Sequence, residues 1–520
     1  MLSLGSTRTT RRLFAAGAAL AAASLPLVGA TAGQALAAPE RAPSTGSGPV
    51  TASVVVPGGA PQVSRLALDG TATTRADRPA ARSALGAAPG YVTGTTVAVD
   101  PAIRLQTVTG FGASLTDSSA YDLSLLPAAD RDAVMTRLFD PVRGAGLSLL
   151  RQPIGASDLA REIYSYDDMP AGRTDYGLKH FSIAHDEAQI LPLLRQAKTL
   201  NPDLTVVASP WSPPGWMKTS GSMIDGRLTD TPRTYRAYAA YLVKFLQAYR
   251  DAGVDVDYLT VQNEPQALER SDYPGTNLDV AQEAKVIAQL GPAIKKAGLR
   301  TKILGFDHNW GVHPWDAGRL EQENGDPEAN YPLKLLGTSA ARWIAGTAYH
   351  CYYGDPAVQS TMKALHPDKE ILETECEGLN LTRAMGTLQN WGQSLTAWNL
   401  ALDENHGPFV GGCKTCTGLV TVDATTKKVT YNERFYLLSA FSSFVRPGAH
   451  RVSSTSVNNI DGQTAQVDSV AFRNPDGSTA VVVRNLSSTE PQRFAVREGS
   501  TQFTATLPAG AYATYSWDAR

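Results

Sequence analysis

The sequence predicts an α/β protein, a (β/α)8 TIM barrel with a side all-β sandwich domain built from both ends of the chain. Eight short apolar runs alternate with helical patterns through the middle of the chain, as they do in a barrel of parallel strands. Short alternating runs broken by Asn, Gly, Asp and Pro flank that region on both sides and indicate β structure. A doubly wound parallel sheet is the alternative architecture for the middle region.

The first segment is predicted to be a signal peptide over residues 1–37. Arg8, Arg11 and Arg12 precede an apolar stretch that ends in an A-L-A-like cleavage site. The paired arginines also fit a twin-arginine signal, and a Sec signal is the alternative. The small residues and Pro26 in the apolar stretch argue against a membrane anchor. We therefore expect a protein that is exported and secreted, without a stable membrane anchor.

The rest of the chain divides into four predicted parts. These are a disordered leader (38–48), an N-terminal part of the side β-domain (49–99), the catalytic barrel (100–440) and a C-terminal β-sandwich domain (441–520). The β-domain is expected to brace the barrel, because its first part precedes the barrel in the sequence. The formal net charge of -2 offers no basic face, so nucleic acid is not an expected partner. We expect a monomer.

The eight apolar runs are predicted to be the barrel strands in chain order. They cover residues 107–117, 147–158, 204–214, 258–265, 302–309, 346–355, 370–378 and 395–403. Patterns of helical period lie between them, the longest over 234–253 and 281–298. Nearly every run ends in polar or aromatic residues, and barrel enzymes build their active sites at those ends of the strands.

Carboxylates end the fourth and seventh runs, whose tips would face each other across the mouth of a barrel. Glu264 follows Asn263 at the fourth tip, and the seventh carries Glu373, Glu375 and Glu377. Alternation places these three on one face, and Glu375, which directly follows the apolar run, best fits the tip. Two carboxylates that flank a sugar bond make a glycosidase, one protonating the leaving oxygen and the other attacking or activating water. Solvated loop acids are the structural alternative.

Aromatic side chains at the strand ends favour a carbohydrate site. Six of them lie there: Trp211, Trp216, Trp310, Trp315, Tyr352 and Trp398. Sugar sites stack apolar sugar faces on such rings and fix hydroxyls with a few polar groups. No metal or cofactor is expected, because the histidines are scattered and show no HxH or HExxH spacing.

The chain has four cysteines, and export permits disulfides. Cys413 and Cys416 lie in a glycine-rich loop, where we predict a disulfide that pins the loop. A redox dithiol and half of a zinc site are the alternatives, but no histidine or second CxxC lies nearby. Pairing of Cys351 with Cys376 is left open.

Several motifs in one order resemble glycoside hydrolase family 30, which includes glucosylceramidases and microbial endo-β-1,6-glucanases. They are GFGASLTDSSA, LLRQPIGASDLAREIYSYDD, ASPWSPPGWMKTSGSM, TVQNEP, TAYHCYY, ILETECEG and AWNLALDENHGP. The resemblance implies retaining hydrolysis with Glu264 as acid/base and Glu375 as nucleophile. It implies that Arg151 supports the nucleophile and that Asn263 binds the sugar 2-hydroxyl.

The same resemblance assigns the remaining substrate contacts. It implies that Asp158 and Trp211 hold the far hydroxyls of a glucose, and that His350, Tyr352 and Trp398 line the pocket. The loop GGCKTCTGLVTVD looks more like the β-1,6-glucanase branch than the human-type glucosylceramidase. We therefore expect a β-glucan substrate cleaved by an endo-β-1,6-glucanase. A glucosylceramidase acting on a glucoside is the alternative, and a non-catalytic carbohydrate-binding protein is a minor one.

Overall fold

The computed structural model describes most of the chain after the predicted leader. The described residues are 50–66, 95–267, 272–314, 316, 330–458 and 466–518, all within the compact unit Ala38–Arg520. The predicted signal peptide, the predicted leader, Trp315 and part of the N-terminal β segment lie outside them. Among the described residues, no helix has the length and apolarity needed to cross a bilayer.

Eight parallel strands form the predicted barrel, one from each of the eight apolar runs. They are β4 (Gly110–Ser114), β5 (Leu149–Pro153), β6 (Thr205–Ser209), β7 (Tyr258–Thr260), β8 (Lys302–Asn309), β9 (Ile344–His350), β10 (Glu370–Glu375) and β11 (Ser394–Ala397). Their order is β10-β9-β8-β7-β6-β5-β4-β11, and a parallel bridge between Cys376 and Ala397 brings the two end strands together. β7 is therefore the fourth strand of the barrel and β10 the seventh.

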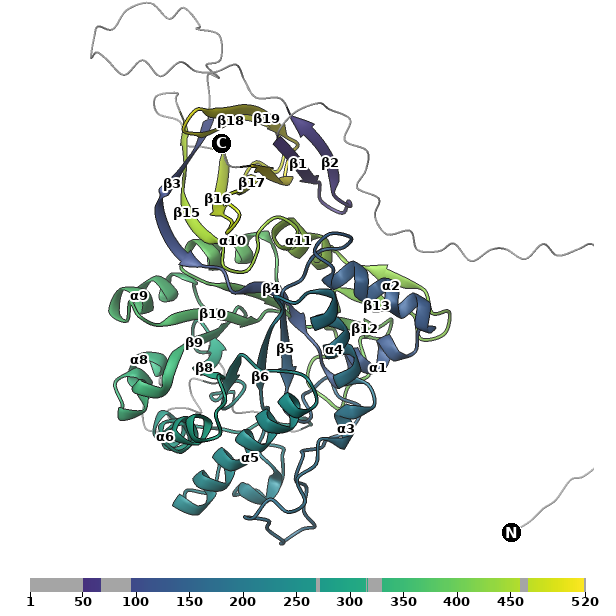
Figure 1. Ribbon diagram of the computed structural model, residues 1–520, viewed down its shortest axis with the longest axis vertical. Coiled ribbons are helices and arrows are strands. Elements are labelled where there is room, and N and C mark those ends of the chain that lie inside the picture. The colour runs from purple at the N-terminus through teal and green to yellow at the C-terminus, as the bar shows by residue number, and fades with distance from the viewer. Residues whose placement is uncertain are drawn as a thin grey trace, which may run out of the picture. The chain divides into compact units, whose positions relative to one another are not determined.

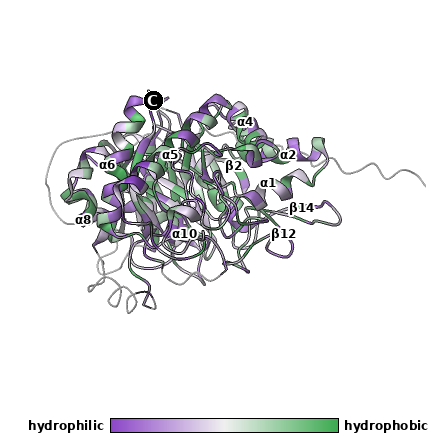
Figure 2. Cartoon of the chain, turned by 90° about the horizontal axis from the view of Figure 1, so that it is seen from below, coloured by the Kyte–Doolittle hydropathy of each residue, from purple (hydrophilic) through white to green (hydrophobic). Residues whose placement is uncertain are grey.

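Helices surround these strands (Figure 1). They are α1 (Asp117–Ser124), α2 (Ala128–Phe139), α3 (Ala184–Glu187), α4 (Ile190–Leu200), α5 (Pro232–Asp251), α6 (Val280–Lys296), α8 (Tyr331–Leu336), α9 (Ala357–Leu365), α10 (Leu381–Gln389) and α11 (Glu433–Ser442). Thr231 caps α5 by accepting from the Thr234 N–H, with Pro232 at the first helical position. Hydrophobic and hydrophilic residues both occur along α5 and α6, as helices that cover a barrel require (Figure 2).

The inner end of the barrel is closed by apolar side chains. A layer of six buried residues, one from each of six neighbouring strands, consists of Leu149, Val207, Tyr258, Leu304, Ala348 and Leu372. All six precede the last residue of their strands. Polar side chains are therefore left to the carboxyl ends of the strands, where a barrel carries its active site.

The second sheet is built from both ends of the chain, as the sequence predicts. Its strands are β1 (Val50–Val55), β2 (Gln62–Leu66), β3 (Thr95–Thr107), β15 (His450–Asn458), β16 (Val467–Arg473), β17 (Thr479–Asn485), β18 (Gln492–Glu498), β19 (Thr501–Leu507) and β20 (Tyr512–Trp517). β1 pairs with β20, and β3 lies between β15 and β18. β3 also crosses residue 100, where the barrel was expected to begin.

Side chains join this sheet to the barrel. The Gln389 amide at the end of α10 donates to Asp468 at 2.8 Å, and Thr514 of β20 donates to the carbonyl oxygen of Ala440 in α11. A three-stranded sheet that the sequence did not suggest lies beyond the last barrel strand, formed by β12 (Ala401–Asp403), β13 (Val420–Val422) and β14 (Val429–Tyr431). The apolar run 395–403 therefore contains two strands, β11 and β12.

Candidate active site

Two carboxylates meet at the carboxyl ends of the fourth and seventh barrel strands. Glu264 follows β7 with a positive φ of 46°, and Glu375 is the last residue of β10. One oxygen of each lies within 4.8 Å of the other and of a His350 ring nitrogen. A left-handed backbone at a non-glycine residue is uncommon and is found most often at functional positions. Here it turns the chain in the segment that follows Thr260, the last residue of β7.

A cavity of about 380 Å³ opens over the two carboxylates. Its lining contains seven residues singled out from the sequence as catalytic or substrate-binding: Asp158, Trp211, Asn263, Glu264, Tyr352, Glu375 and Trp398. Tyr273, Glu377, Gly378, Arg383, Cys413 and Cys416 also line it. The sequence positions are as far apart as 158 and 416, so the barrel brings them together through the common end of its strands.

Arg151 of β5 holds the Glu375 side of the site. Its guanidinium is fully buried, and one Nη donates to Glu375 Oε2. The other Nη donates to Asn263 Oδ1 at 2.7 Å and to Asp307 Oδ2 at 2.9 Å. The Tyr352 hydroxyl donates to the second Glu375 oxygen at 2.8 Å. Both oxygens of Glu375 are therefore fixed by donors from other strand ends.

Asp307 accepts hydrogen bonds from several neighbouring strands. In the sequence it is only one of many polar residues at the ends of the apolar runs. It is fully buried in β8 and accepts from Ser209, Thr260 and Thr374 at 2.7, 2.8 and 2.7 Å, as well as from Arg151. Burial alone would raise the pKa of Asp307, but Arg151 and hydrogen bonding hold it well below the usual range. The signal in the sequence is an Asp that begins the polar end of the run ILGFDHN.

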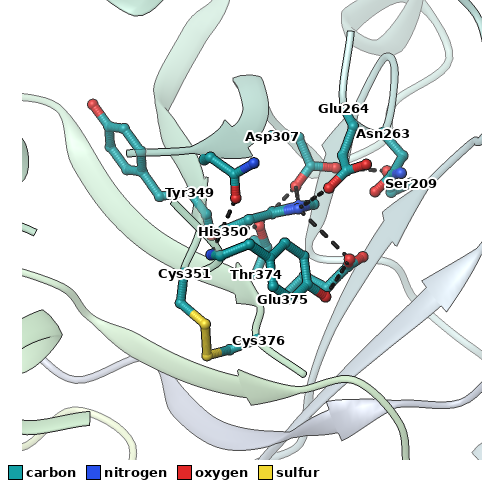
Figure 3. A network of polar contacts seen from close by, with 12 residues as sticks. Ser209, Asn263, Glu264, Asp307, Tyr349, His350, Cys351, Thr374, Glu375 and Cys376 are labelled. Atoms are coloured by element: carbon teal, nitrogen blue, oxygen red, sulfur yellow. Dashed lines mark hydrogen bonds and ion pairs between the residues drawn. A yellow bond between two sulfur atoms is a disulfide. The ribbon is translucent and has the colours of Figure 1, made fainter. Parts of the chain in front are cut away.

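His350, which the family resemblance assigns to the pocket, lies against the two carboxylates that line the cavity. Its ring is fully buried behind the carboxylates, 3.2 Å from Glu264, 3.2 Å from Asp307 and 3.6 Å from Glu375 (Figure 3). Burial alone would lower its pKa, but the Glu375 charge and hydrogen bonds to Asp307 and Glu264 raise it to about 10. The surrounding carboxylates therefore favour the imidazolium form of the ring at neutral pH.

The three glutamates after the seventh run occupy different surroundings, although simple alternation predicted one shared face. The pairing of β10 with β9 shifts between Glu373 and Glu375, which breaks the alternation. Glu373 is fully buried, accepts from the Thr396 N–H at 2.7 Å, and burial raises its pKa to about 8. Glu377 forms an ion pair with Arg434 at 2.7 Å. Of the three, only Glu375 lies within 4.8 Å of Glu264 and His350 as part of that cluster.

The aromatic residues of the sequence prediction separate into two groups. Trp211 and Trp398 stack with ring centroids 5.1 Å apart and an interplanar angle of 23°, and Tyr352 joins them at the cavity. Trp216 instead donates to the carbonyl oxygen of Asp167, and buried Trp310 donates to Gln359. The two latter indoles serve packing, which is the ordinary role of a tryptophan.

Both pairs of cysteines form disulfides. Cys413 and Cys416 are bonded in the loop beside the cavity, and Cys351 is bonded to Cys376 between the ends of β9 and β10 (Figure 3). Cys351 and Cys376 directly follow His350 and Glu375 in the sequence. The second bridge therefore ties together the two strand ends that carry those residues.

Known protein families match both parts of the chain. The Glycosyl hydrolase family 30 TIM-barrel domain matches residues 108–445, and the Glycosyl hydrolase family 30 beta sandwich domain matches residues 448–515. The endo-1,6-beta-D-glucanase of Neurospora crassa is 37% identical over 414 residues, which cover 75% of this chain and 81% of that protein. The lysosomal acid glucosylceramidase of Mus musculus is 28% identical over 463 residues, covering 82% and 84%.

Solved structures agree with these matches. The endo-beta1,6-glucanase BT3312 superimposes with a TM-score of 0.77 and 28% identity, covering 91% of this chain and 100% of that one. SrfJ from Salmonella typhimurium gives a TM-score of 0.72 and 25% identity over the same shares of the two chains.

Proposed function

This chain belongs to glycoside hydrolase family 30 and is a glycoside hydrolase, and from that premise we propose that it is a secreted, retaining endo-β-1,6-glucanase. The observation that carries the mechanism is that one carboxylate oxygen of Glu264 and one of Glu375 lie within 4.8 Å of each other in the lining of the cavity. Retaining enzymes hold their two carboxyl groups roughly 5–5.5 Å apart, whereas inverting enzymes leave about 6.5–9.5 Å for a water molecule. The observed spacing favours retention.

In the first step, Glu375 attacks the anomeric carbon while Glu264 gives its proton to the leaving oxygen. The bond from carbon to the leaving oxygen breaks, and a glycosyl ester to Glu375 forms. Arg151 and Tyr352 hold the two oxygens of Glu375 in line for this attack. In the second step, Glu264 takes a proton from water, whose oxygen displaces Glu375 from the same carbon, so the β configuration returns.

The surrounding charges support these roles. Burial raises the pKa of Glu375, while the His350 and Arg151 cations oppose that rise and favour the carboxylate. The two cations face the carboxylates of Asp307 and Glu375, to which both are paired.

Asn263 and the aromatic pair are proposed to bind the sugar at the point of cleavage. Arg151 already occupies Asn263 Oδ1, so Asn263 has its NH₂ group to offer a sugar hydroxyl. Trp211 and Trp398 offer ring faces, and Asp158 offers a carboxylate at the same cavity.

The choice of a β-1,6-glucan rests on the relatives. Endo-1,6-beta-D-glucanases of three fungi are 31–37% identical to this chain, against 28–31% for glucosylceramidases of Caenorhabditis elegans and Mus musculus. Glucosylceramide hydrolysis is the second candidate, because those enzymes also match over three quarters of the chain or more.

Product analysis on a β-1,6-glucan, run beside glucosylceramide in detergent, tests the proposal. Early release of short gluco-oligosaccharides from the glucan, with the β anomer first seen by proton NMR, is the expected result. Glucose released from the lipid alone would establish the second candidate, and an α anomer appearing first would reject retention. Export is tested separately by N-terminal sequencing of protein recovered from culture medium, which should begin near Ala38.

A further inference from the structure

One wall of the cavity is made by a short segment closed by a disulfide, which we call the cysteine loop (residues 411–416). Both of its cysteines line the cavity, together with Asp158, Trp211 and Trp398. Cys416 is buried, whereas Lys414 and Thr415 at the tip are exposed. The loop therefore turns its disulfide toward the cavity and its polar tip toward solvent.

The disulfide packs into the same apolar cluster as the stacked indoles. Trp211, Trp398, Leu159, Leu402 and Cys416 form this cluster, and Tyr273 and Cys413 pack against it. The two indoles stack on each other at a centroid distance of 5.1 Å, and the other members of this cluster surround the pair. The sulfur atoms belong to those surroundings, and soft polarizable sulfur makes favourable contacts with aromatic rings.

The backbone of the cysteine loop lies directly on Asp158. Gly412 has a φ of +70°, and a Cβ placed there would lie 2.6 Å from the Asp158 Cβ and 3.2 Å from Tyr273 Cδ1. The Val410 N–H donates to the Asp158 carbonyl oxygen at 3.0 Å. Only glycine allows an approach this close, so the loop and Asp158 are positioned together.

The far side of the loop is fixed as well. The Thr417 N–H donates to Glu377 Oε1 at 3.1 Å, and Glu377 is paired with Arg434. His406 Nδ1 lies 3.0 Å from the Cys416 carbonyl oxygen, to which it donates. The disulfide spans the segment between this anchor and the one on Asp158.

We propose that the Cys413–Cys416 disulfide is a positioning element for substrate affinity, holding Asp158 and the Trp211–Trp398 pair at the separation a glucosyl unit requires. The inference rests on the proposed function, since it concerns the same sugar site. Glu264 and Glu375 are held by other groups, namely His350, Arg151 and Tyr352. Loss of the disulfide should therefore raise KM and leave kcat nearly unchanged, the pattern for an interaction that binds ground state and transition state alike.

The test compares the double variant Cys413→Ser/Cys416→Ser with a matched control, Lys414→Ala/Thr415→Ala, which changes the same loop and keeps the disulfide. We expect the KM for β-1,6-glucan to rise about tenfold in the serine variant, because a loosened wall must be ordered again on binding. We expect kcat to stay within about threefold and the control to match wild type. A KM within about twofold of wild type would overturn the inference, as would a fall in kcat as large as the rise in KM.

Reduction of the wild-type enzyme provides a reversible version of the test. A dithiol reagent attacks the disulfide at the half-buried Cys413 sulfur, supplies two electrons and two protons, and becomes its own cyclic disulfide, whereas both Cys351 and Cys376 are buried. On reduction, the KM of the wild-type enzyme should rise to that of the serine variant, and reoxidation should restore it. The same treatment should leave the KM of the serine variant unchanged. Thermal unfolding of the reduced wild-type enzyme and of the serine variant distinguishes a rise in KM caused by the lost disulfide from one caused by loss of the fold.

An aryl β-glucoside assayed in parallel distinguishes the two proposals. Wild-type enzyme that cleaves the aryl glucoside but not the glucan would reject the proposed substrate, and the KM comparison would then be made on the aryl glucoside. Wild-type enzyme that cleaves the glucan with a KM insensitive to the disulfide would reject the inference alone.

Discussion

Replacing Asp307 by Asn should damage both the stability and the activity of the enzyme. The carboxylate lies 2.9 Å from the Arg151 guanidinium and is fully buried, as is Arg151. Coulomb's law with an effective dielectric constant of about 20 gives roughly 6 kcal/mol of attraction at that separation. Burial of the two charges offsets part of this, and removing one partner of such a pair costs about 3–5 kcal/mol. We expect this loss in the free energy of unfolding, measured by urea denaturation at pH 7.

The pH dependence of that loss provides a stricter check. The pKa of Asp307 is held well below 3.8 in the folded protein, so its contribution is complete above the unfolded pKa and declines as the pH falls below that value. The difference in the free energy of unfolding between wild type and Asp307→Asn should therefore become smaller below about pH 4. Asp203→Asn, at an exposed position in the turn between α4 and β6, should change the free energy of unfolding by less than about 0.5 kcal/mol. A difference below about 1 kcal/mol, or one that stays constant down to pH 3, would refute the reasoning.

Three further predictions concern activity. Glu264→Gln and Glu375→Gln should each lower kcat by at least about 100-fold. Glu373→Gln should keep most activity below pH 7, because the Glu373 carboxyl, with a pKa of about 8, is already neutral at such a pH. Normal turnover by Glu375→Gln would reassign the nucleophile. His350→Gln removes a cation beside Glu375, and burial already raises the pKa of Glu375. The acid limb of the kcat/KM profile should therefore move to higher pH. An acid limb that does not move would contradict the charge assigned to His350. Trp211→Ala should raise KM about tenfold in steady-state assays, and an unchanged KM would remove the indole from the sugar site.

The barrel and its paired carboxylates could be predicted because both follow from local pattern. Each strand is a short apolar run that ends in polar or aromatic residues, and a parallel barrel gathers such ends at one face. Glu264 and Glu375 were therefore identifiable by their place after the fourth and seventh runs.

The surroundings of the individual site residues depend on features that the alternation of residues along a strand cannot predict. The shift between Glu373 and Glu375 places neighbouring acids in different surroundings, and a second shift between Phe306 and His308 accompanies the positive φ of Asp307. The burial of His350 depends on groups from other strands that surround its ring. Each of these is a tertiary effect, visible only when the strands are assembled.

The pairing of β1 with β20 also determines when the nine-stranded sheet can be completed during synthesis of the chain. β1 ends at Val55, and β20 ends at Trp517, so the first strand waits for nearly the entire chain to be translated. At about 5–20 residues per second, this delay is roughly 25–90 s. Until then, β1 exposes an unpaired edge of the kind that invites aggregation. A ribosome that stops before β20 therefore releases a chain in which β1 keeps β2 but lacks its partner on the other side.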